Sequence, residues 1–238
     1  MPDPSSAPLT VAITGASGAL GQALLRRFHG RGAQLIALCH GRTPLQLDGP
    51  DGQPIPLHQV HWQVGEEAVL EPLLEQVDVL VINHGINVHG DCSAEATGSS
   101  LEVNALSAWR LLELFAVVAQ RREGRRRAEV WVNTSEAEIQ PAVSPLYEIS
   151  KRLLGQLLSL RAPELAQALR LRRLVLGPFR SALNPVGVMG ADWVAGEILR
   201  QAEWNCSLII VTPNPLTYLL MPLATLGRWA YVGLLRRS

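Results

Sequence analysis

A tyrosine and a lysine stand four residues apart in the segment YEISK, residues 147–151. On a helix this spacing brings the two side chains to one face. A free phenol has a pKa of about 10, which is too high for proton transfer at neutral pH. A neighbouring ammonium favours the phenolate and lowers that pKa. Tyr147 is therefore a candidate general acid/base, and the hydroxyl of Ser135, twelve residues earlier, is a candidate partner for the substrate oxygen.

Lys151 is the single lysine among 21 basic residues. Arginine stays charged in almost any environment, whereas lysine is a compact ammonium whose pKa can be lowered. An arginine-biased composition can leave one lysine by chance. Only its spacing from Tyr147 favours the functional interpretation.

A glycine-rich turn, TGASGALG at residues 14–21, joins an apolar run to a helical pattern. The backbone N–H groups of such a turn and the N-terminus of the following helix bind pyrophosphate. This predicts a dinucleotide site, for which the candidate residues are Gly15, Ser17, Gly18, Ala19, Leu20 and Gly21.

The end of the second apolar run distinguishes the two nicotinamide cofactors. NAD-binding proteins usually place an acidic residue there for the ribose hydroxyls. This chain has His40, Gly41 and Arg42 instead, and Arg42 with His40 is suited to a 2′-phosphate. We expect NADP(H) as cofactor in preference to NAD(H), with a solvated loop arginine as the alternative reading of Arg42.

Seven apolar runs alternate with helical patterns and would position these residues. The predicted strands are Leu9–Thr14, Leu35–Cys39, Leu57–Val64, Val77–Asn83, Glu129–Thr134, Leu171–Leu176 and Ser207–Thr212. The predicted helices are Gly18–Phe28, Glu66–Gln76, a long helix through Leu101 and Ala119, Tyr147–Leu160 and Asp192–Trp204. Strands without strict alternation, separated by helices, indicate a parallel sheet covered on both faces. The fold class is thus α/β: a single doubly wound, Rossmann-type domain with a seven-stranded parallel sheet and an apolar C-terminal extension.

The domain organisation follows from the same reading. Residues 1–8 are expected to form a flexible tail, residues 9–212 the dinucleotide-binding domain, and residues 213–238 an apolar segment. The tail has no basic region or apolar run and does not resemble a secretory signal.

Composition excludes several classes of protein. The formal net charge is zero, so the overall electrostatic potential of the protein does not favour binding to nucleic acid. The three cysteines, Cys39, Cys92 and Cys206, are widely spaced and suit neither a disulfide framework nor a metal site. We expect a cytoplasmic protein without a metal.

The ordered set of motifs resembles the short-chain dehydrogenase/reductase family. The set comprises TGASGALG, then Asn83-His84-Gly85, Asn104, Ser135, YEISK and finally Gly177-Pro178 with Ser181. Two further segments, residues 176–195 and 209–220, resemble a cyanobacterial group of proteins often labelled bifunctional sterol desaturase/short-chain dehydrogenase. The desaturase part of that label has no counterpart here, because only two of the six histidines, His58 and His61, stand close together.

The resemblance implies roles for individual residues. Tyr147 would be the acid/base, Ser135 would polarise the carbonyl, and Lys151 would bind the nicotinamide ribose. Asn104 would hold a water in a proton relay that reaches Lys151. The resemblance also places Asn83, His84, Gly85, Tyr147, Lys151, Pro178 and Ser181 around the cofactor.

The chain departs from the family pattern at several points, among them His84 in place of a small residue and Gly177-Pro178 in place of Pro-Gly. Its glycine spacing matches the extended branch of the family, yet no long C-terminal sugar-binding region follows. Gln63 and Val64 stand where an aspartate often contacts adenine. The gap between serine and tyrosine is one residue short, which leaves Thr134 as a possible substitute for Ser135.

The apolar segment from Pro215 to Leu235 is interrupted by Pro222 and Arg228, which argues against a membrane span. Two alternatives stay open. One is a helix lying on a membrane surface, which would suggest an apolar or lipid-like substrate. The other is burial against the core or a second subunit of a homo-oligomer.

We therefore expect an NADP(H)-dependent oxidoreductase that transfers a hydride between nicotinamide and a small-molecule carbonyl or alcohol substrate. Two alternatives are kept. A nucleotide-sugar epimerase or dehydratase is suggested by the glycine spacing, although few residues remain for a substrate domain. A non-catalytic dinucleotide sensor could dispense with both Tyr147 and Lys151.

Overall fold

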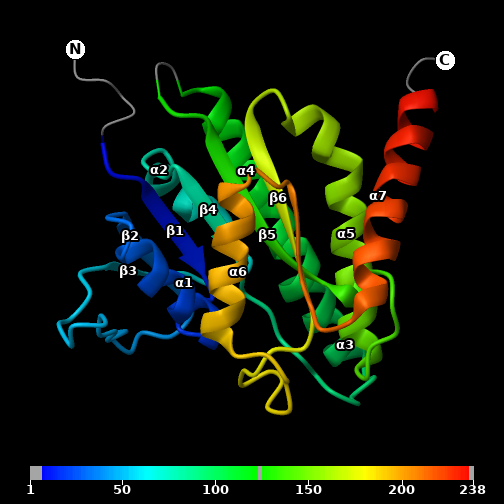
Figure 1. The fold of residues 1–238 in the computed structure, drawn as a ribbon, viewed down its shortest axis with the longest axis horizontal. Helices are drawn as coiled ribbons and strands as arrows, with labels where there is room; N and C mark the ends of the chain where they lie inside the picture. The colour runs from blue at the N-terminus through cyan, green and yellow to red at the C-terminus, as the bar shows by residue number, and fades with distance from the viewer. Residues whose placement is uncertain (1–6, 123–124, 236–238) are drawn as a thin grey trace.

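A computed structural model describes residues 7–122 and 125–235 of the chain. Its centre is the predicted parallel sheet of seven strands (Figure 1). The strand order, which the sequence did not predict, is β3-β2-β1-β4-β5-β6-β7. The strands are β1 Thr10–Thr14, β2 Gln34–Cys39, β3 His58–His61, β4 Val79–Ile82, β5 Ala128–Ser135, β6 Leu169–Leu176 and β7 Leu208–Val211. The strand order reverses at β1, because β2 and β3 are added on one side of it and β4 to β7 on the other. In open α/β sheets, ligands bind beyond the carboxyl ends of the strands at such a point.

Helices cover both faces of the sheet (Figure 1). The helices α1 (Ala19–His29) and α6 (Ala191–Glu203) share one core cluster with the sheet, and α4 (Ser107–Gln120) and α5 (Pro145–Leu165) share the other. Within β1, Val11 and Ile13 belong to the first cluster and Ala12 to the second. Because both faces are buried, the strands carry apolar residues at successive positions rather than at alternate ones.

The element boundaries differ from prediction in two informative places. The predicted helix Glu66–Gln76 is a short 3₁₀ turn, η1 (Glu67–Leu70), followed by one turn of helix, α2 (Glu71–Leu74). The predicted long helix starts earlier, at α3 (Ala94–Leu101), where the side chain of Ser93 caps the helix. A π-helical segment, η2 (Glu102–Leu106), then separates α3 from α4. Isolated π turns inside helices often occur at functional sites.

The C-terminal segment forms one helix, α7 (Pro215–Leu235), which runs along α5 at the β7 edge of the sheet (Figure 1). Pro222 is contained within the helix. No helix in the described part of the chain is both long and apolar enough to cross a bilayer. Of the predicted N-terminal tail, residues 1–6 lie outside the described residues, as do Arg236 and Arg237.

A buried ion pair fastens the segment after β5 to β6. Arg173 on β6 donates from Nε to Oε1 of Glu138 at 3.0 Å and from Nη1 to Oγ of Ser159 at 3.2 Å. Glu138 belongs to a short 3₁₀ turn, η3 (Glu136–Glu138), which directly follows Ser135. Both charged side chains are less than one tenth exposed. Loss of one partner would leave the other as an uncompensated buried charge.

We predict that Arg173→Met lowers the free energy of unfolding by about 3–5 kcal/mol, because Glu138 would stay buried without its cation. Arg31→Met is the matched control, since the ion pair of Arg31 with Glu203 lies on the surface and contributes less than about 1 kcal/mol. Urea unfolding of the two variants measures the difference. Equal small losses in both would contradict the structural role of the buried pair.

Candidate active site

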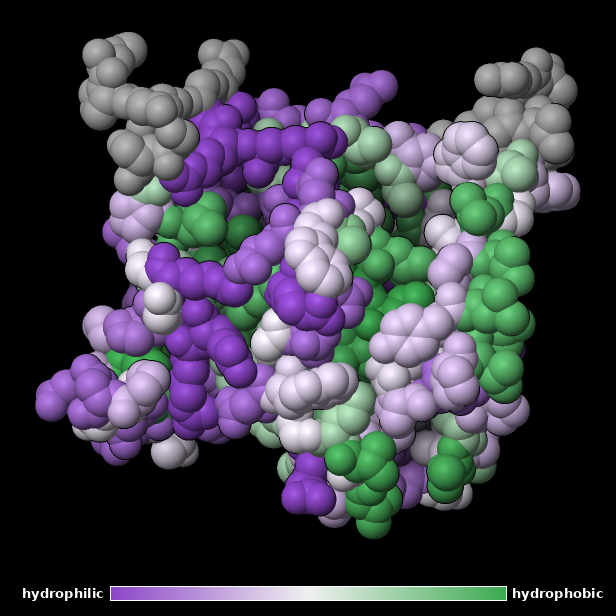
Figure 2. Space-filling view, in the orientation of Figure 1, coloured by the Kyte–Doolittle hydropathy of each residue, from purple (hydrophilic) through white to green (hydrophobic). Residues whose placement is uncertain are grey.

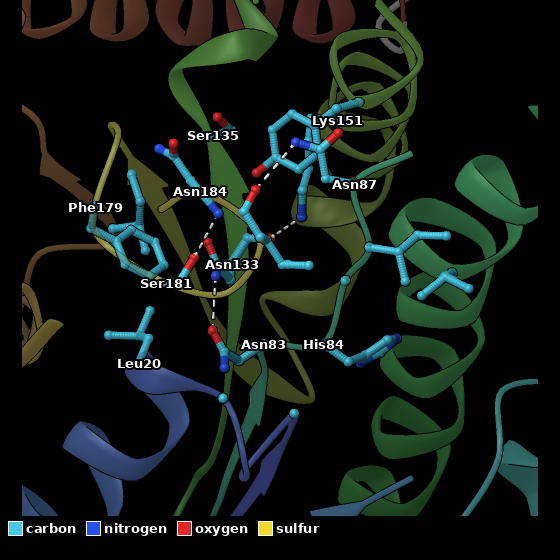
Figure 3. Close-up of a pocket in the computed structure, with 18 of the residues that line it drawn as sticks. Leu20, Asn83, His84, Asn87, Asn133, Ser135, Lys151, Phe179, Ser181 and Asn184 are labelled. Carbon is cyan, nitrogen blue, oxygen red and sulfur yellow. Dashed lines mark hydrogen bonds between the residues drawn. The ribbon is translucent and has the colours of Figure 1, made fainter. Parts of the chain in front are cut away.

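A cavity of about 810 Å³ opens at the carboxyl ends of the strands. Its wall comes from the turns after β1 to β6 and from the start of α5. Figure 3 shows side chains from these separate elements converging on one space. The predicted residues that line it are Gly15, Ser17, Gly18, Ala19, Leu20, His40, Asn83, His84, Gly85, Ser135, Tyr147, Lys151, Pro178 and Ser181. Gly21, Arg42 and Asn104 do not line it.

The first two turns of α5 present Tyr147 and Lys151 to this cavity. Pro145 opens the helix, a position that suits its fixed φ angle and missing N–H. The Lys151 side chain is buried, and its Nζ lies 5.7 Å from the centre of the Tyr147 ring. Ser135, the last residue of β5, hydrogen-bonds the Tyr147 side chain. The three predicted residues are thus brought together by β5 and α5.

Burial governs the protonation of this cluster. It lowers the pKa of the Lys151 ammonium from 10.5 to about 8. It raises the pKa of the Tyr147 phenol above 10.0, and the hydrogen bond from Ser135 offsets only part of that rise. The net shift of the phenol pKa is therefore upward, not downward as expected from the neighbouring ammonium, because burial outweighs the effects that favour the phenolate. Removing the phenolate from water costs more than the nearby hydrogen bond returns.

The choice between Thr134 and Ser135 is resolved by their hydrogen bonds. The Thr134 hydroxyl is buried and donates to the carbonyl of Leu174 on β6 at 3.1 Å. The Ser135 hydroxyl instead accepts from the N–H of Ala137 at 3.2 Å and reaches Tyr147. Of the two hydroxyls, that of Ser135 therefore lies beside the phenol, whereas that of Thr134 is used within the sheet.

Asn104, in the π-helical segment, connects two segments next to the site. Its Oδ1 accepts from the N–H of Ile86 at 2.8 Å, and its Nδ2 donates to the Ile86 carbonyl at 3.0 Å and to Ser150 Oγ at 3.1 Å. Both polar groups of the side chain therefore hold the loop after β4 against α5. The water relay expected for Asn104 stays a prediction.

A chain of amide contacts connects Lys151 with the glycine turn. Lys151 Nζ donates to the Asn133 carbonyl at 3.0 Å, and Asn133 Nδ2 donates to Asn83 Oδ1 at 2.8 Å (Figure 3). The Thr14 hydroxyl oxygen in turn accepts from the N–H of Asn83 at 2.8 Å. Sequence reasoning missed Asn133, although an asparagine in an otherwise apolar strand was an available signal. His84 also contacts Thr14, and burial lowers the pKa of its imidazole to about 4, so this side chain is neutral.

The glycine turn is shaped by close backbone packing. Gly15 has a φ of +61°, and a Cβ there would lie 2.9 Å from the Cα of His84. A side chain at this position would both strain the backbone and push the turn away from β4. Ala19 and Leu20, in the first turn of α1, line the cavity, so the positive end of the helix dipole faces it. Gly21 lies behind the turn, where a Cβ would meet the Ala16 Cα at 2.8 Å.

The predicted phosphate-recognition residues lie at the neighbouring rim. Arg42 lines a separate cavity of about 530 Å³ together with Pro44, Gln59 and His61, whereas His40 lines the main cavity. The rings of His40 and His61 have centroids 6.4 Å apart, which places the two cavities side by side. His61, from the end of β3, was not among the predicted site residues. Its relevance depends on the pairing of β3 with β2, which the sequence does not display.

The half of the cavity away from the glycine turn combines polar and apolar groups. Asn87 Nδ2 donates to the Leu183 carbonyl at 3.4 Å, which ties the loop after β4 to the segment between β6 and α6. Glu136, Ser181 and Asn184 supply further polar groups to the lining. The apolar lining residues of this half are Ile86, Val103, Pro141, Ala142, Val143, Phe179 and Leu183. This half can therefore hold a molecule with both polar and apolar parts.

Comparison with known proteins identifies relatives. A family model described as "NAD dependent epimerase/dehydratase family" matches residues 11–152. The chain is 45% identical over 212 residues to a monoglucosyldiacylglycerol epimerase from Synechocystis sp.. That match covers 89% of this chain but 51% of the relative, so the chain spans about half the length of this curated relative.

Solved structures share the fold at low sequence identity. A short-chain dehydrogenase from Sphingobium yanoikuyae in complex with NADPH has a TM-score of 0.78 at 17% identity, covering 94% of this chain and 95% of the other. A short-chain dehydrogenase from Burkholderia cenocepacia in complex with NADP has a TM-score of 0.77 at 16% identity, with the same coverage.

We predict that NADPH affinity is constant at neutral pH and weakens as the pH rises above about 8, where Lys151 loses its proton. The sign follows because the buried ammonium, depressed from 10.5, is the form that can donate to ribose hydroxyls. Fluorescence titration between pH 6 and 10 measures the dissociation constant. The Lys151→Arg variant stays cationic, so its affinity should not change across this range, whatever its absolute value. A flat profile for the unmodified protein would contradict the assignment.

Proposed function

Since the chain belongs to the NAD dependent epimerase/dehydratase family and shares the short-chain dehydrogenase/reductase fold, we propose that it is an NAD(P)-dependent epimerase. Its substrate is the sugar headgroup of a glycosylated diacylglycerol, and it inverts one hydroxyl-bearing carbon of that sugar. The observation that carries the proposal is the Ser135–Tyr147–Lys151 cluster beside the glycine turn in one cavity. The 45% identity to monoglucosyldiacylglycerol epimerase supports the substrate class.

The residues present fit a nicotinamide dinucleotide. The pyrophosphate would lie on the glycine turn, where Gly15 leaves space that a Cβ would fill and α1 directs its N-terminus. The nicotinamide ribose would lie near Lys151, whose buried ammonium has no carboxylate within ion-pair distance in the described part of the chain. Pro178 and Ser181 would flank the nicotinamide end. When bound, the cofactor supplies an acceptor and donor of hydride.

The residues of the chain carry the proton. As a hydride leaves the sugar carbon, the hydroxyl proton passes to the phenolate of Tyr147, and a ketone forms. Ser135 donates to the ketone oxygen and stabilises the charge that develops there. Lys151 favours the ionised phenol that must accept the proton. When the hydride returns to the opposite face of the ketone, Tyr147 gives the proton back, so no net oxidation occurs and the carbon is inverted.

Epimerisation differs from simple reduction in what the cavity must permit. The ketone has to present both faces to one hydride donor without leaving. The polar groups of Asn87 and Asn184 and the cavity of about 810 Å³ support reorientation of a sugar ring. The small number of residues after β6 had argued against an epimerase, and that argument loses its force if a diacylglycerol chain rather than a nucleotide anchors the sugar.

A carbonyl reductase that uses NADP(H) is the second candidate, because the same three residues would serve a net reduction. The 2′-phosphate preference is part of the proposal in both cases. His40 lines the main cavity, Arg42 lies beside it, and no acidic residue stands between them.

We predict that Arg42→Ala weakens NADPH binding by about tenfold to a hundredfold, the amount expected for loss of one charge-assisted contact, and leaves NADH binding unchanged. Isothermal titration with each cofactor measures the ratio. Arg26→Ala, at the far end of α1, is the control for loss of a positive charge. An equal loss for both cofactors in Arg42→Ala would exclude recognition of the 2′-phosphate.

We predict that Tyr147→Phe retains NADPH binding and loses turnover by about two to four orders of magnitude, since only the transferable proton is removed. Steady-state rates with the glycolipid, together with the cofactor dissociation constant, test this. Normal turnover in the variant would show that another group acts as the acid.

The proposed reaction is tested with glucosyldiacylglycerol that carries deuterium on each ring carbon in turn, in the presence of a trace of cofactor. The expected product is an epimer that keeps its deuterium, because the same hydride returns. Accumulation of a ketone or of a reduced lipid in proportion to added cofactor would favour the dehydrogenase or reductase. An absence of any conversion, together with intact cofactor binding, would favour a sensor.

A further inference from the structure

Exposed apolar side chains lie on two of the segments that contribute residues to the cavity wall. Val143, in the loop before α5, is fully exposed, and Val186 and Val188, between β6 and α6, are 86% and 68% exposed. Leu183 is exposed as well, although it lines the cavity. Single exposed apolar residues are common on soluble proteins, whereas several on neighbouring segments of one site indicate an interaction surface.

The first half of α7 extends this apolar surface. Leu216, Leu219, Leu220 and Leu223 are 40–59% exposed, whereas Thr217 and Met221 on the opposite side of the helix are buried. Both the inner and the outer side of the helix are thus apolar, which is unusual for a helix that faces water. Figure 2 shows hydrophobic patches along α7 and at the lower edge of the molecule.

Hydrogen bonds join the two parts into one surface. Gln140, three residues before Val143, donates from Nε2 to Thr217 Oγ1 at 2.7 Å and accepts from Asn214 Nδ2 at 2.5 Å. Glu136, which lines the cavity, accepts from Thr212 at 2.5 Å. The start of α7 is therefore fixed to the loop that follows Ser135. We call Val143, Val186, Val188 and the exposed leucines of α7 the rim surface.

The charged residues of this region are all of one sign. Residues 139–144, 178–191 and 213–238 contain no aspartate or glutamate, although the chain has 21 acidic residues. Their only charged residues are arginines, including the exposed Arg180, which stands in the chain between the cavity-lining residues Phe179 and Ser181. A surface with apolar side chains, arginines and no carboxylates complements the anionic headgroups and acyl chains of a bilayer.

We propose that the rim surface docks on a lipid bilayer, with the valines and the exposed face of α7 inserted among the headgroups. The cavity mouth then opens onto the membrane, so a sugar headgroup enters while its acyl chains stay in the bilayer. This inference rests on the proposed function for its substrate, but the docking itself depends only on the rim surface. It selects the membrane-surface alternative for residues 213–238.

The test is co-sedimentation of the full chain with vesicles of phosphatidylcholine and phosphatidylglycerol, with no cofactor or glycolipid present. The unmodified chain should sediment with the vesicles, more strongly as the anionic lipid increases. Val186→Asp and Leu219→Glu should each weaken binding by about tenfold, because each places a carboxylate among headgroups. Val69→Asp is the matched control: Val69 is 63% exposed on η1, beside the opposite edge strand, and its substitution should change nothing.

Two further measurements distinguish a loss of membrane binding from misfolding and from loss of the proposed reaction. NADPH binding by each variant shows that the domain is intact, and conversion of detergent-dispersed glycolipid reports the proposed reaction without a membrane. A chain that ignores vesicles of every composition overturns the docking proposal, even if it epimerises dispersed lipid. A chain that forms a dimer which Leu219→Glu dissociates, without vesicle binding, also overturns it and assigns the surface to a second copy.

Discussion

The structure depends on a lysine ammonium that is almost completely removed from solvent. Lys151 is 4% exposed, and its ammonium donates a hydrogen bond to a neutral carbonyl, that of Asn133. An isolated buried cation is costly, and that cost appears here as a pKa of about 8. The fold therefore keeps a group that is readily stabilised by any ligand offering oxygen atoms in the cavity. Desolvation acts in the same way on the partly buried phenol of Tyr147: it disfavours the charged phenolate and so raises the pKa.

The surrounding elements can be understood as the means of holding that pair in place. Two strands of a fully buried parallel sheet supply Ser135 and the glycine turn, and α5 supplies Tyr147 and Lys151. The π turn at residues 102–106 places Asn104 so that it joins the loop after β4 to α5. The buried pair of Glu138 and Arg173 fixes the segment immediately after Ser135. Together these contacts hold α5, the loop after β4 and the segment after β5 in fixed positions around the cavity.

Local sequence signals predicted the part of this account that local physics determines. The seven strands, the glycine turn and the helix that carries Tyr147 and Lys151 follow from periodicity and from residue spacing. The contribution of His61 could not be found that way, because it depends on which strands become neighbours. Asn133 was recognisable as an asparagine in a largely apolar strand, but its contact with Asn83 depends on the pairing of β4 with β5. The direction of the Tyr147 pKa was wrong for the same reason. Spacing along a helix reveals a nearby ammonium, but burial is a property of the assembled domain and outweighs it here.

The proposed epimerase oxidises a sugar carbon transiently and reduces it again before release. The most direct measurement is rapid mixing of the protein, loaded with oxidised cofactor, with glucosyldiacylglycerol while the absorbance of reduced nicotinamide is followed. The account predicts an absorbance that rises and then returns to a low steady level while the epimer accumulates. A stable rise with release of a keto-lipid, or no rise while the protein still binds both ligands, would contradict it.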